Sequence, residues 1–141
     1  MELTKENYIF TDNKELIKLD EVQRLLKQSH WAVNRSVGII ESTIESSICF
    51  MIFHDTKLIG FARVISDLAV YSLILDVIID EQYRGKGLGT KLIEFINNYP
   101  KLINTSKVLW TKYAKNLYEK SGYIEEDCYT LMFNRTRILN E

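Results

Sequence analysis

The stretch YRGKGLGTKL, Tyr83–Leu92, places three of the chain's six glycines within five positions and leads directly into a run of helical periodicity. Apolar residues repeat at helical spacing from Leu88 until Pro100 ends the run. The segment before the glycines, VYSLILDVIID over residues 70–80, is apolar on both faces apart from Asp76. Such a run is typical of a central strand that is covered on both sides. The sequence therefore predicts a buried strand, a glycine-rich turn and an amphipathic helix in succession.

This succession is suited to binding an anion at the start of the helix. The first N–H groups of a helix have no intrahelical partner, and glycine lets the backbone approach a phosphate and adopt positive φ. Arg84 and Lys86 add positive charge. The alternative is a plain strand–helix turn with solvated basic side chains, and the glycine pattern alone leaves the two readings about even. The position between a buried strand and an amphipathic helix favours a phosphate site.

The spacing of the glycines limits which phosphate ligand the turn binds. A P-loop needs Gly-Lys-Ser/Thr at the helix start, whereas this chain has Gly89-Thr90-Lys91, so magnesium-dependent nucleotide hydrolysis is not expected. A Rossmann fingerprint fails because the third glycine comes one position early and most of the sheet precedes it. A methyltransferase glycine loop is a remote third option, because it normally opens a longer doubly wound domain.

The rest of the chain predicts an α/β domain around a mixed sheet, in the order β-α-α-β-β-β-α-β-α-β-β. Asp20 is expected to cap the first helix, and Gly122 to follow the last helix as its C′ residue. The expected strands lie at Tyr8–Thr11, 47–54, 58–66, 70–80 and 107–111, with a closing pair within 123–134; the expected helices lie within 18–31, 34–47, 88–99 and 114–122.

Composition predicts one domain, residues 1–141, with 46% apolar residues and a formal net charge of −1. Such a chain has no bulk attraction to nucleic acid or to an anionic membrane. The N-terminal ten residues include acidic side chains and no long apolar run, so we expect no signal peptide, no membrane span and a cytoplasmic location. Cys49 and Cys128 lack metal-ligand spacing, and we interpret both as reduced packing residues, with no metal site expected.

Two ordered motifs resemble the GNAT superfamily of N-acetyltransferases. The family's acetyl-CoA motif, Arg/Gln-x-x-Gly-x-Gly/Ala, corresponds to Arg84–Gly89. LDVIIDEQY at residues 75–83 resembles the family's fourth strand, and AKNLYEKSGYIEE at residues 114–126 resembles its later A-x-x-x-Y-x-x-x-G-F/Y segment. The order of elements agrees across essentially the whole chain, and the resemblance implies the GNAT fold.

The resemblance also implies acetyl-CoA as cosubstrate, with no metal. Backbone groups of Val77, Ile78 and Ile79 would hold the pantetheine arm, which can pair like an added strand. The amides of seven consecutive residues would hold the pyrophosphate: Arg84, Gly85, Lys86, Gly87, Leu88, Gly89 and Thr90. In the family's pattern Tyr118 is the acid that protonates the coenzyme A sulfur; the alternative is a core tyrosine whose hydroxyl bonds to the backbone.

The chain departs from the family's pattern at two positions. Thr111 stands seven residues before Tyr118, where relatives commonly have Asn. Leu73 stands where many relatives place a glutamate as general base. Asp76 is then an alternative candidate for the general base, acting directly or through water. The default is a structural carboxylate paired with Arg63 on the neighbouring strand, or hydrogen-bonded to Trp110, because an unpaired carboxylate in an apolar strand is costly.

Acceptor selection in this family usually comes from the first two helices, their connection and the closing strands. There Trp31 could wall a small acceptor and Arg35 could hold a carboxylate, while Arg63 and Asp67 could face the same cleft. The equally weighted alternative is that Trp31 packs the helix pair and Arg35 pairs with Asp67 or Glu41.

The sequence thus predicts an acetyl-CoA-dependent N-acetyltransferase that acts by direct attack of a primary amine, small-molecule or peptide, in a ternary complex. A catalytically silent acyl-CoA-binding module is the alternative. Edge strands near the C-terminus are compatible with a homodimer, which the sequence does not itself show.

Overall fold

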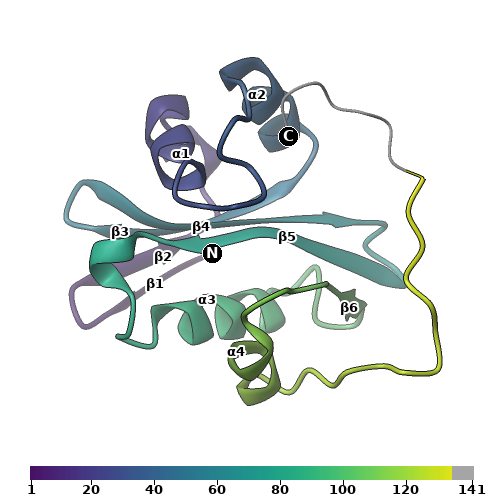
Figure 1. Ribbon diagram of the computed structural model, residues 1–141. Coiled ribbons are helices and arrows are strands. Elements are labelled where there is room, and N and C mark those ends of the chain that lie inside the picture. The colour runs from purple at the N-terminus through teal and green to yellow at the C-terminus, as the bar shows by residue number, and fades with distance from the viewer. Residues whose placement is uncertain (135–141) are drawn as a thin grey trace.

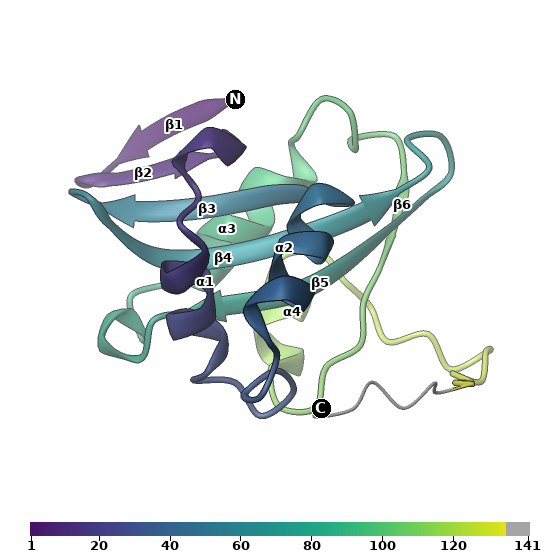
Figure 2. The same cartoon turned by 90° about the horizontal axis from the view of Figure 1, so that it is seen from above.

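The computed structural model describes residues 1–134 and arranges them in three layers (Figures 1 and 2). Helices α1 (Leu19–Leu26) and α2 (Val37–Glu45) cover one face of a sheet, and α3 (Leu88–Asn97) and α4 (Lys115–Lys120) lie against the other. No helix in this part of the chain is both long enough and apolar enough to cross a membrane.

The sheet has six strands in sequence order, and every neighbouring pair is antiparallel except the last. The strands are β1 (Glu2–Lys5), β2 (Tyr8–Thr11), β3 (Ile48–His54), β4 (Lys57–Ser66), β5 (Tyr71–Ile79) and β6 (Ser106–Val108), with short 3-10 helices η1 (Lys14–Leu16) and η2 (Glu81–Tyr83). The predicted α/β class with a mixed, mostly antiparallel sheet is confirmed.

Each face of the sheet has its own hydrophobic core. The core under α1 and α2 contains Val22, Leu25, Met51 and Phe61. The core on the α3 side contains Phe50, Ile52, Val64, Leu92 and Ile96, with Leu117 and Tyr118 of α4 packed against it. Along β4 the side chains alternate between the two cores, because Phe61 faces one core while Ala62 and Val64 face the other. Burial on both sides explains why β3, β4 and β5 are mostly apolar.

The sheet opens beside β5. Strand β6 pairs with β5 only at Tyr71–Leu73, and beyond that point no strand among residues 1–134 pairs with this edge of β5. The unpaired half of β5 runs towards the glycine-rich turn. Its backbone groups therefore remain available to an extended ligand.

Three local expectations were wrong. An additional strand, β1, pairs with β2 through a tight turn in which Glu6 and Asn7 both have positive φ; every residue of β1 is exposed, so no hydrophobic alternation marked it. Asp20 lies inside the first turn of α1 and makes no cap. Residues 123–134 contain no strand, and their apolar side chains, such as Ile124 and Met132, are largely exposed because no partner edge covers them.

Candidate active site

The structure requires glycine in this turn for two reasons: backbone conformation at Gly85 and Gly87, and close packing at Gly89. Gly85 and Gly87 have φ of 78° and 74°, in the left-handed region, and a Cβ on either would meet nothing within 4 Å. Gly87 is the N-cap of α3, which receives no side-chain cap. At Gly89 a Cβ would lie 2.7 Å from Leu117 Cδ1, so this glycine allows α3 and α4 to approach closely. The start of α3 is therefore free of a side-chain cap, and the two glycines before it have left-handed backbone conformations. Its first N–H groups are left without a partner from a capping side chain.

Polar contacts of Arg84 and of the buried Asp80 hold the turn in place. Arg84 Nε donates to the carbonyl of Ile79 (2.9 Å), which fixes the guanidinium at the end of β5. Asp80 is 2% exposed, accepts the N–H of Gln82 and receives Arg24 Nη1 at 2.6 Å. Burial alone would raise the pKa of Asp80, but the hydrogen bonds from Arg24 and the Gln82 amide and the charge of Lys57 lower it. Sequence reasoning missed the Arg24–Asp80 pair because its members lie far apart in the chain.

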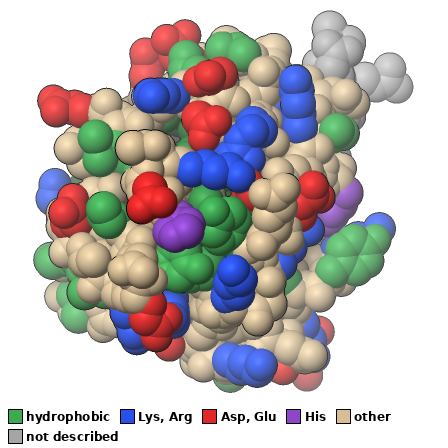
Figure 3. All heavy atoms as spheres, turned by 90° about the vertical axis from the view of Figure 1, so that its left-hand side faces the viewer, with side chains coloured by type: hydrophobic (Ala, Val, Ile, Leu, Met, Phe, Trp, Pro, Cys, Tyr) green, Lys and Arg blue, Asp and Glu red, His purple; other side chains and the backbone are tan. Residues whose placement is uncertain are grey.

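Next to the turn, the surface carries an aromatic cluster with two lysines. Lys86 Nζ and Lys57 Nζ lie 5.3 Å and 5.5 Å from the centre of the Tyr83 ring. The Tyr83 hydroxyl lies 3.0 Å from His54 Nδ1. Figure 3 views the molecule from the side of the β3–β4 turn, and there basic and acidic side chains are interspersed around apolar groups. Positive charge is thus local to the turn and does not form a broad field.

Asp76 is the centre of a buried polar cluster on the α1–α2 side of the sheet. Its Oδ2 accepts Nη1 of Arg35 and Nε of Arg63, each at 2.6 Å, and its Oδ1 accepts Nε1 of Trp31 at 3.0 Å. Arg63 also reaches Ser47 Oγ at 3.4 Å. The default interpretation, pairing with Arg63, is confirmed. The indole partner is Trp31; Trp110 instead contacts the ring of Phe133.

The charges around Asp76 decide its protonation state. Burial alone would raise its pKa, but the charges of Arg63 and Arg35 and their hydrogen bonds outweigh burial and lower it. The carboxylate therefore stays ionised at neutral pH. A carboxylate with a lowered pKa is a weak proton acceptor.

The α1–α2 connection places Trp31 and Arg35 against β5. Trp31 is 39% exposed, so its side chain is partly open to solvent while Nε1 is held by Asp76. His30, beside it, contacts the ring of Tyr113 at 5.2 Å between centroids. Tyr113 belongs to the segment between β6 and α4. The two segments that flank the opening of the sheet therefore meet, an arrangement that no sequence signal indicated.

Tyr118 lies on the opposite side of the sheet. It projects from α4, packs against the α3-side core and contacts the ring of Tyr123 edge-on at 5.9 Å. Burial raises the pKa of Tyr118 to about 12, so its phenol stays protonated at neutral pH. Tyr118 thus packs on the α3 side of the sheet while the carboxylate of Asp76 lies on the α1–α2 side, and the structure does not bring them into contact.

Three other candidates lie apart from this cluster. Asp67 is in the β4–β5 turn, where its Oδ1 accepts the N–H groups of Ala69, Val70 and Tyr71, so the expectation that it shares a cleft with Arg63 is corrected. Thr111 Oγ1 accepts the N–H of Ala114 and shapes the entry to α4. Leu73 lies in register between Ile65 and Val108 and has no titratable group.

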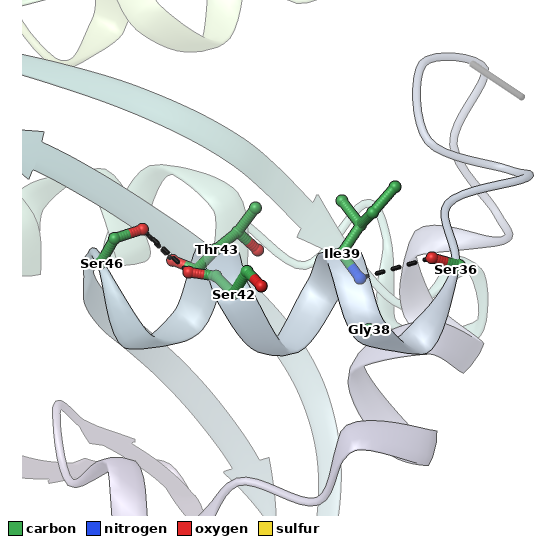
Figure 4. Close-up of a pocket in the computed structure, with 6 residues that line it drawn as sticks. All are labelled: Ser36, Gly38, Ile39, Ser42, Thr43 and Ser46. Carbon is green, nitrogen blue, oxygen red and sulfur yellow. Dashed lines mark hydrogen bonds between the residues drawn. The ribbon is translucent and has the colours of Figure 1, made fainter. Parts of the chain in front are cut away.

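The two cysteines and a surface hollow contribute nothing to this site. Cys49 is buried, as a packing residue should be, whereas Cys128 is exposed, so the packing interpretation is wrong for Cys128. A hollow of about 540 Å³ lies along the outer face of α2 (Figure 4). Its hydroxyls serve the helix itself, since Ser36 caps the N–H of Ile39 and Ser46 donates to the carbonyl of Ser42. The residues lining the hollow are Ser36, Gly38, Ile39, Ser42, Thr43 and Ser46.

Comparison with known families identifies this arrangement. A model of the acetyltransferase (GNAT) domain matches residues 45–125, which is more than half of the chain. The chain belongs to the GNAT acetyltransferase family. The matched segment of this GNAT domain includes β4, β5, the glycine turn and Tyr118, whereas Trp31 and Arg35 precede it.

Relatives of this GNAT domain agree with that assignment. The Uncharacterized N-acetyltransferase ycf52 of Gracilaria tenuistipitata var. liui is 28% identical over 117 residues, which cover 78% of this chain. The match spans 64% of that relative, slightly less than two thirds of its length.

Solved structures share the fold. A GNAT-family acetyltransferase from Xanthomonas campestris pv. campestris superposes with a TM-score of 0.83 at 25% identity, covering 92% of this chain and 95% of the other. A GNAT acetyltransferase from Elizabethkingia anophelis with acetyl-CoA bound has a TM-score of 0.64 at 16% identity, covering 82% of this chain and 75% of the other.

Proposed function

We propose that this GNAT domain is an acetyl-CoA-dependent N-acetyltransferase that transfers the acetyl group to a primary amine of a small molecule or a peptide. The observation that carries the proposal is that α3 starts without a side-chain cap, at a glycine with left-handed backbone conformation, beside the unpaired half of β5. The helix start suits a diphosphate and the strand edge suits an amide-bearing arm, and coenzyme A contains both groups in one molecule.

In the proposed complex, the backbone amides from Arg84 to Thr90 bind the pyrophosphate. The backbone of Val77–Ile79 pairs with the pantetheine arm along the edge that β6 leaves free. The acetyl-CoA present in the Elizabethkingia anophelis structure supports this use of the fold. The thioester then lies between β5 and α4, close to the plane of the sheet.

The reaction needs a neutral amine and support for the groups that become negative. The amine nitrogen attacks the thioester carbon, the carbonyl oxygen becomes an oxyanion, and the C–S bond breaks to leave coenzyme A thiolate; the nitrogen loses one proton and the sulfur gains one. In the proposed complex, Tyr118 donates a hydrogen bond to the sulfur. Because its pKa is about 12, it remains a donor at neutral pH and stabilises the thiolate before the sulfur is protonated.

The proton from the amine leaves through water. Asp76 is paired with two guanidinium groups and its pKa is lowered, which argues against the general-base role that the sequence raised. Leu73 offers no titratable group. An amine that reaches the site in its neutral form needs no protein base to start the reaction.

The acceptor would approach from the side of the α1–α2 connection. The partly exposed Trp31 supplies an apolar wall there, and Arg35 and Arg63 supply a buried polar floor. Asp67 is not part of this floor, because the turn uses its carboxylate.

The decisive experiment measures thiol release from acetyl-CoA across a panel of small amines and N-terminal peptides, together with coenzyme A binding by calorimetry. We expect turnover with at least one amine. Lys86→Ala should weaken coenzyme A binding several-fold, whereas Lys101→Ala, an exposed lysine beyond the other end of α3, should not. Binding without turnover on any acceptor would favour the silent acyl-CoA-binding module, and retention of S-adenosylmethionine in place of coenzyme A would favour a methyltransferase.

A further inference from the structure

We infer that Asp76 is a positioning residue: its side chain fixes a left-handed bulge in β5 and ties that bulge to the acceptor side, so that it sets the geometry of acetyl transfer. This inference rests on the proposed function. It assigns to the Trp31–Arg35–Arg63–Asp76 cluster a role distinct from proton transfer. Three independent features of the structure support it.

The first feature is the bulge itself. Phe61 pairs with Ile78 and Arg63 pairs with Leu75, so the single residue Ala62 of β4 lies opposite two residues of β5. Asp76 is the first of the two and has φ of 53°, a conformation that residues with side chains rarely adopt. Asp and Asn tolerate it better than most residues, and glycine adopts it freely.

The second feature is the change of face that the bulge produces. Ile74 belongs to the core on the α3 side, yet Ile78, four residues later, belongs to the core under α1 and α2. In a regular strand these two residues would share a face. The bulge therefore determines which backbone groups of Val77–Ile79 point along the free edge. Loss of the bulge would turn the segment that carries the pantetheine contacts.

The third feature is the set of contacts that hold the bulge. Asp76 is 8% exposed, and its carboxylate is bound by three side chains from two segments: Trp31 and Arg35 from the α1–α2 connection and Arg63 from β4. The acceptor side is thus joined to β5 through three polar contacts on one side chain. A shift in either partner segment is thereby passed to the strand that borders the reacting groups.

A set of substitutions separates this role from that of a base. Asp76→Asn keeps the left-handed conformation, and its single carbonyl oxygen can accept either from Trp31 or from the two guanidinium groups, but it cannot act as a base. Asp76→Gly keeps the conformation and removes every contact. Asp55 lies in the exposed β3–β4 turn and also has φ of 53°, so Asp55→Asn and Asp55→Gly are matched controls for the backbone change.

We expect Asp76→Asn to keep the shape of the pH–rate profile and to lose less than about tenfold in kcat. Asp76→Gly should fold but lose roughly 10- to 100-fold in kcat, because reacting groups misplaced by about 1 Å lose that much. Both Asp55 variants should match the wild type. If Asp76→Asn loses the acidic limb of the profile and is as inactive as Asp76→Gly, Asp76 is a base. If Asp76→Gly keeps full kcat, the contacts of the Asp76 carboxylate do not position the reacting groups, and the inference is wrong.

A second measurement keeps the inference testable if the chain proves to have no transferase activity. Amide hydrogen exchange over residues 71–83 reports the order of the bulge without any substrate. We expect faster exchange there in Asp76→Gly and little change in Asp76→Asn. Unchanged exchange in Asp76→Gly would overturn the inference whatever the activity, whereas absent turnover in a wild type that binds coenzyme A would overturn only the proposed function.

Discussion

Replacing single glycines by alanine tests whether the turn is built as described, because one chemical change has opposite expected effects at different positions. Gly87 has φ of 74° and open space around its missing Cβ, so Gly87→Ala causes strain without a clash. Left-handed backbone costs an L-residue about 1–2 kcal/mol. The lower entropy of the unfolded chain returns about 0.4–1 kcal/mol. The net expectation is a loss of about 1 kcal/mol in the free energy of unfolding.

Gly38 is the matched control. It lies in the first turn of α2 and a Cβ there also meets nothing within 4 Å, but its φ is not in the left-handed region. Alanine favours the helix, so Gly38→Ala should stabilise by about 0.5 kcal/mol or more. The two variants should therefore differ by about 1.5 kcal/mol. For a chain of this size that difference is roughly 5 °C in Tm.

Urea unfolding followed by circular dichroism measures both free energies, and calorimetry measures coenzyme A binding. Gly87→Ala should also weaken binding by about tenfold, because its methyl group occupies the space in front of the helix N–H groups. Gly38→Ala should bind like the wild type. Equal stability of the two variants would refute the left-handed backbone conformation at Gly87. Full coenzyme A affinity in Gly87→Ala would refute the assignment of this helix start as an anion site.

Further predictions concern the acid and the buried ion pairs. Tyr118→Phe should lower kcat by roughly 10-fold or more with little effect on coenzyme A affinity. Its control, Tyr123→Phe, should lose about 1 kcal/mol of stability and keep kcat, because the Tyr123 hydroxyl donates to Asn97 at 2.8 Å. Arg24→Leu should lose about 2 kcal/mol in urea unfolding, because it leaves the buried Asp80 without its closest cation. The pKa values of Asp76 and Asp80 are lowered in the folded state, so their stabilisation is complete above the unfolded value near 3.9 and is lost as pH falls further. The free energy of unfolding should thus fall steeply below about pH 4, and a flat profile there would contradict both pairs.

The sequence predicted the elements whose causes are local. The glycine spacing, the helical repeat after Leu88 and the apolar run before it are short-range patterns, and the structure has the turn, α3 and β5 where those patterns lie. Gly122 likewise has φ of 86° directly after α4, as a C′ residue should. At these positions the local backbone conformation or the local periodicity favours particular residue types. One sequence is therefore enough to predict the structure there.

Features that depend on distant partners could not be read in the same way. Asp76 stands out as the charged residue of β5, but the sequence does not show that it forms a bulge, because a strand that is apolar on both faces looks the same before and after a change of face. The choice of Trp31 over Trp110 as the indole partner depends on how the α1–α2 connection folds back. The strands predicted within residues 123–134 have suitable residues, but a strand also needs a neighbouring edge, which this segment does not contact.

The pairing of arginines with buried carboxylates explains why the turn relies on backbone N–H groups to attract an anion. Arg24 is committed to Asp80, and Arg35 and Arg63 are committed to Asp76, so these cations neutralise buried carboxylates. Arg84 donates through Nε to the carbonyl of Ile79, which leaves its remaining N–H groups and Lys86 as the basic groups of the turn itself. In a chain of net charge −1, two cations are a weak attraction for a polyanion. Fixed N–H dipoles at a helix start add attraction that needs no net charge, and glycine is the residue that leaves them uncovered.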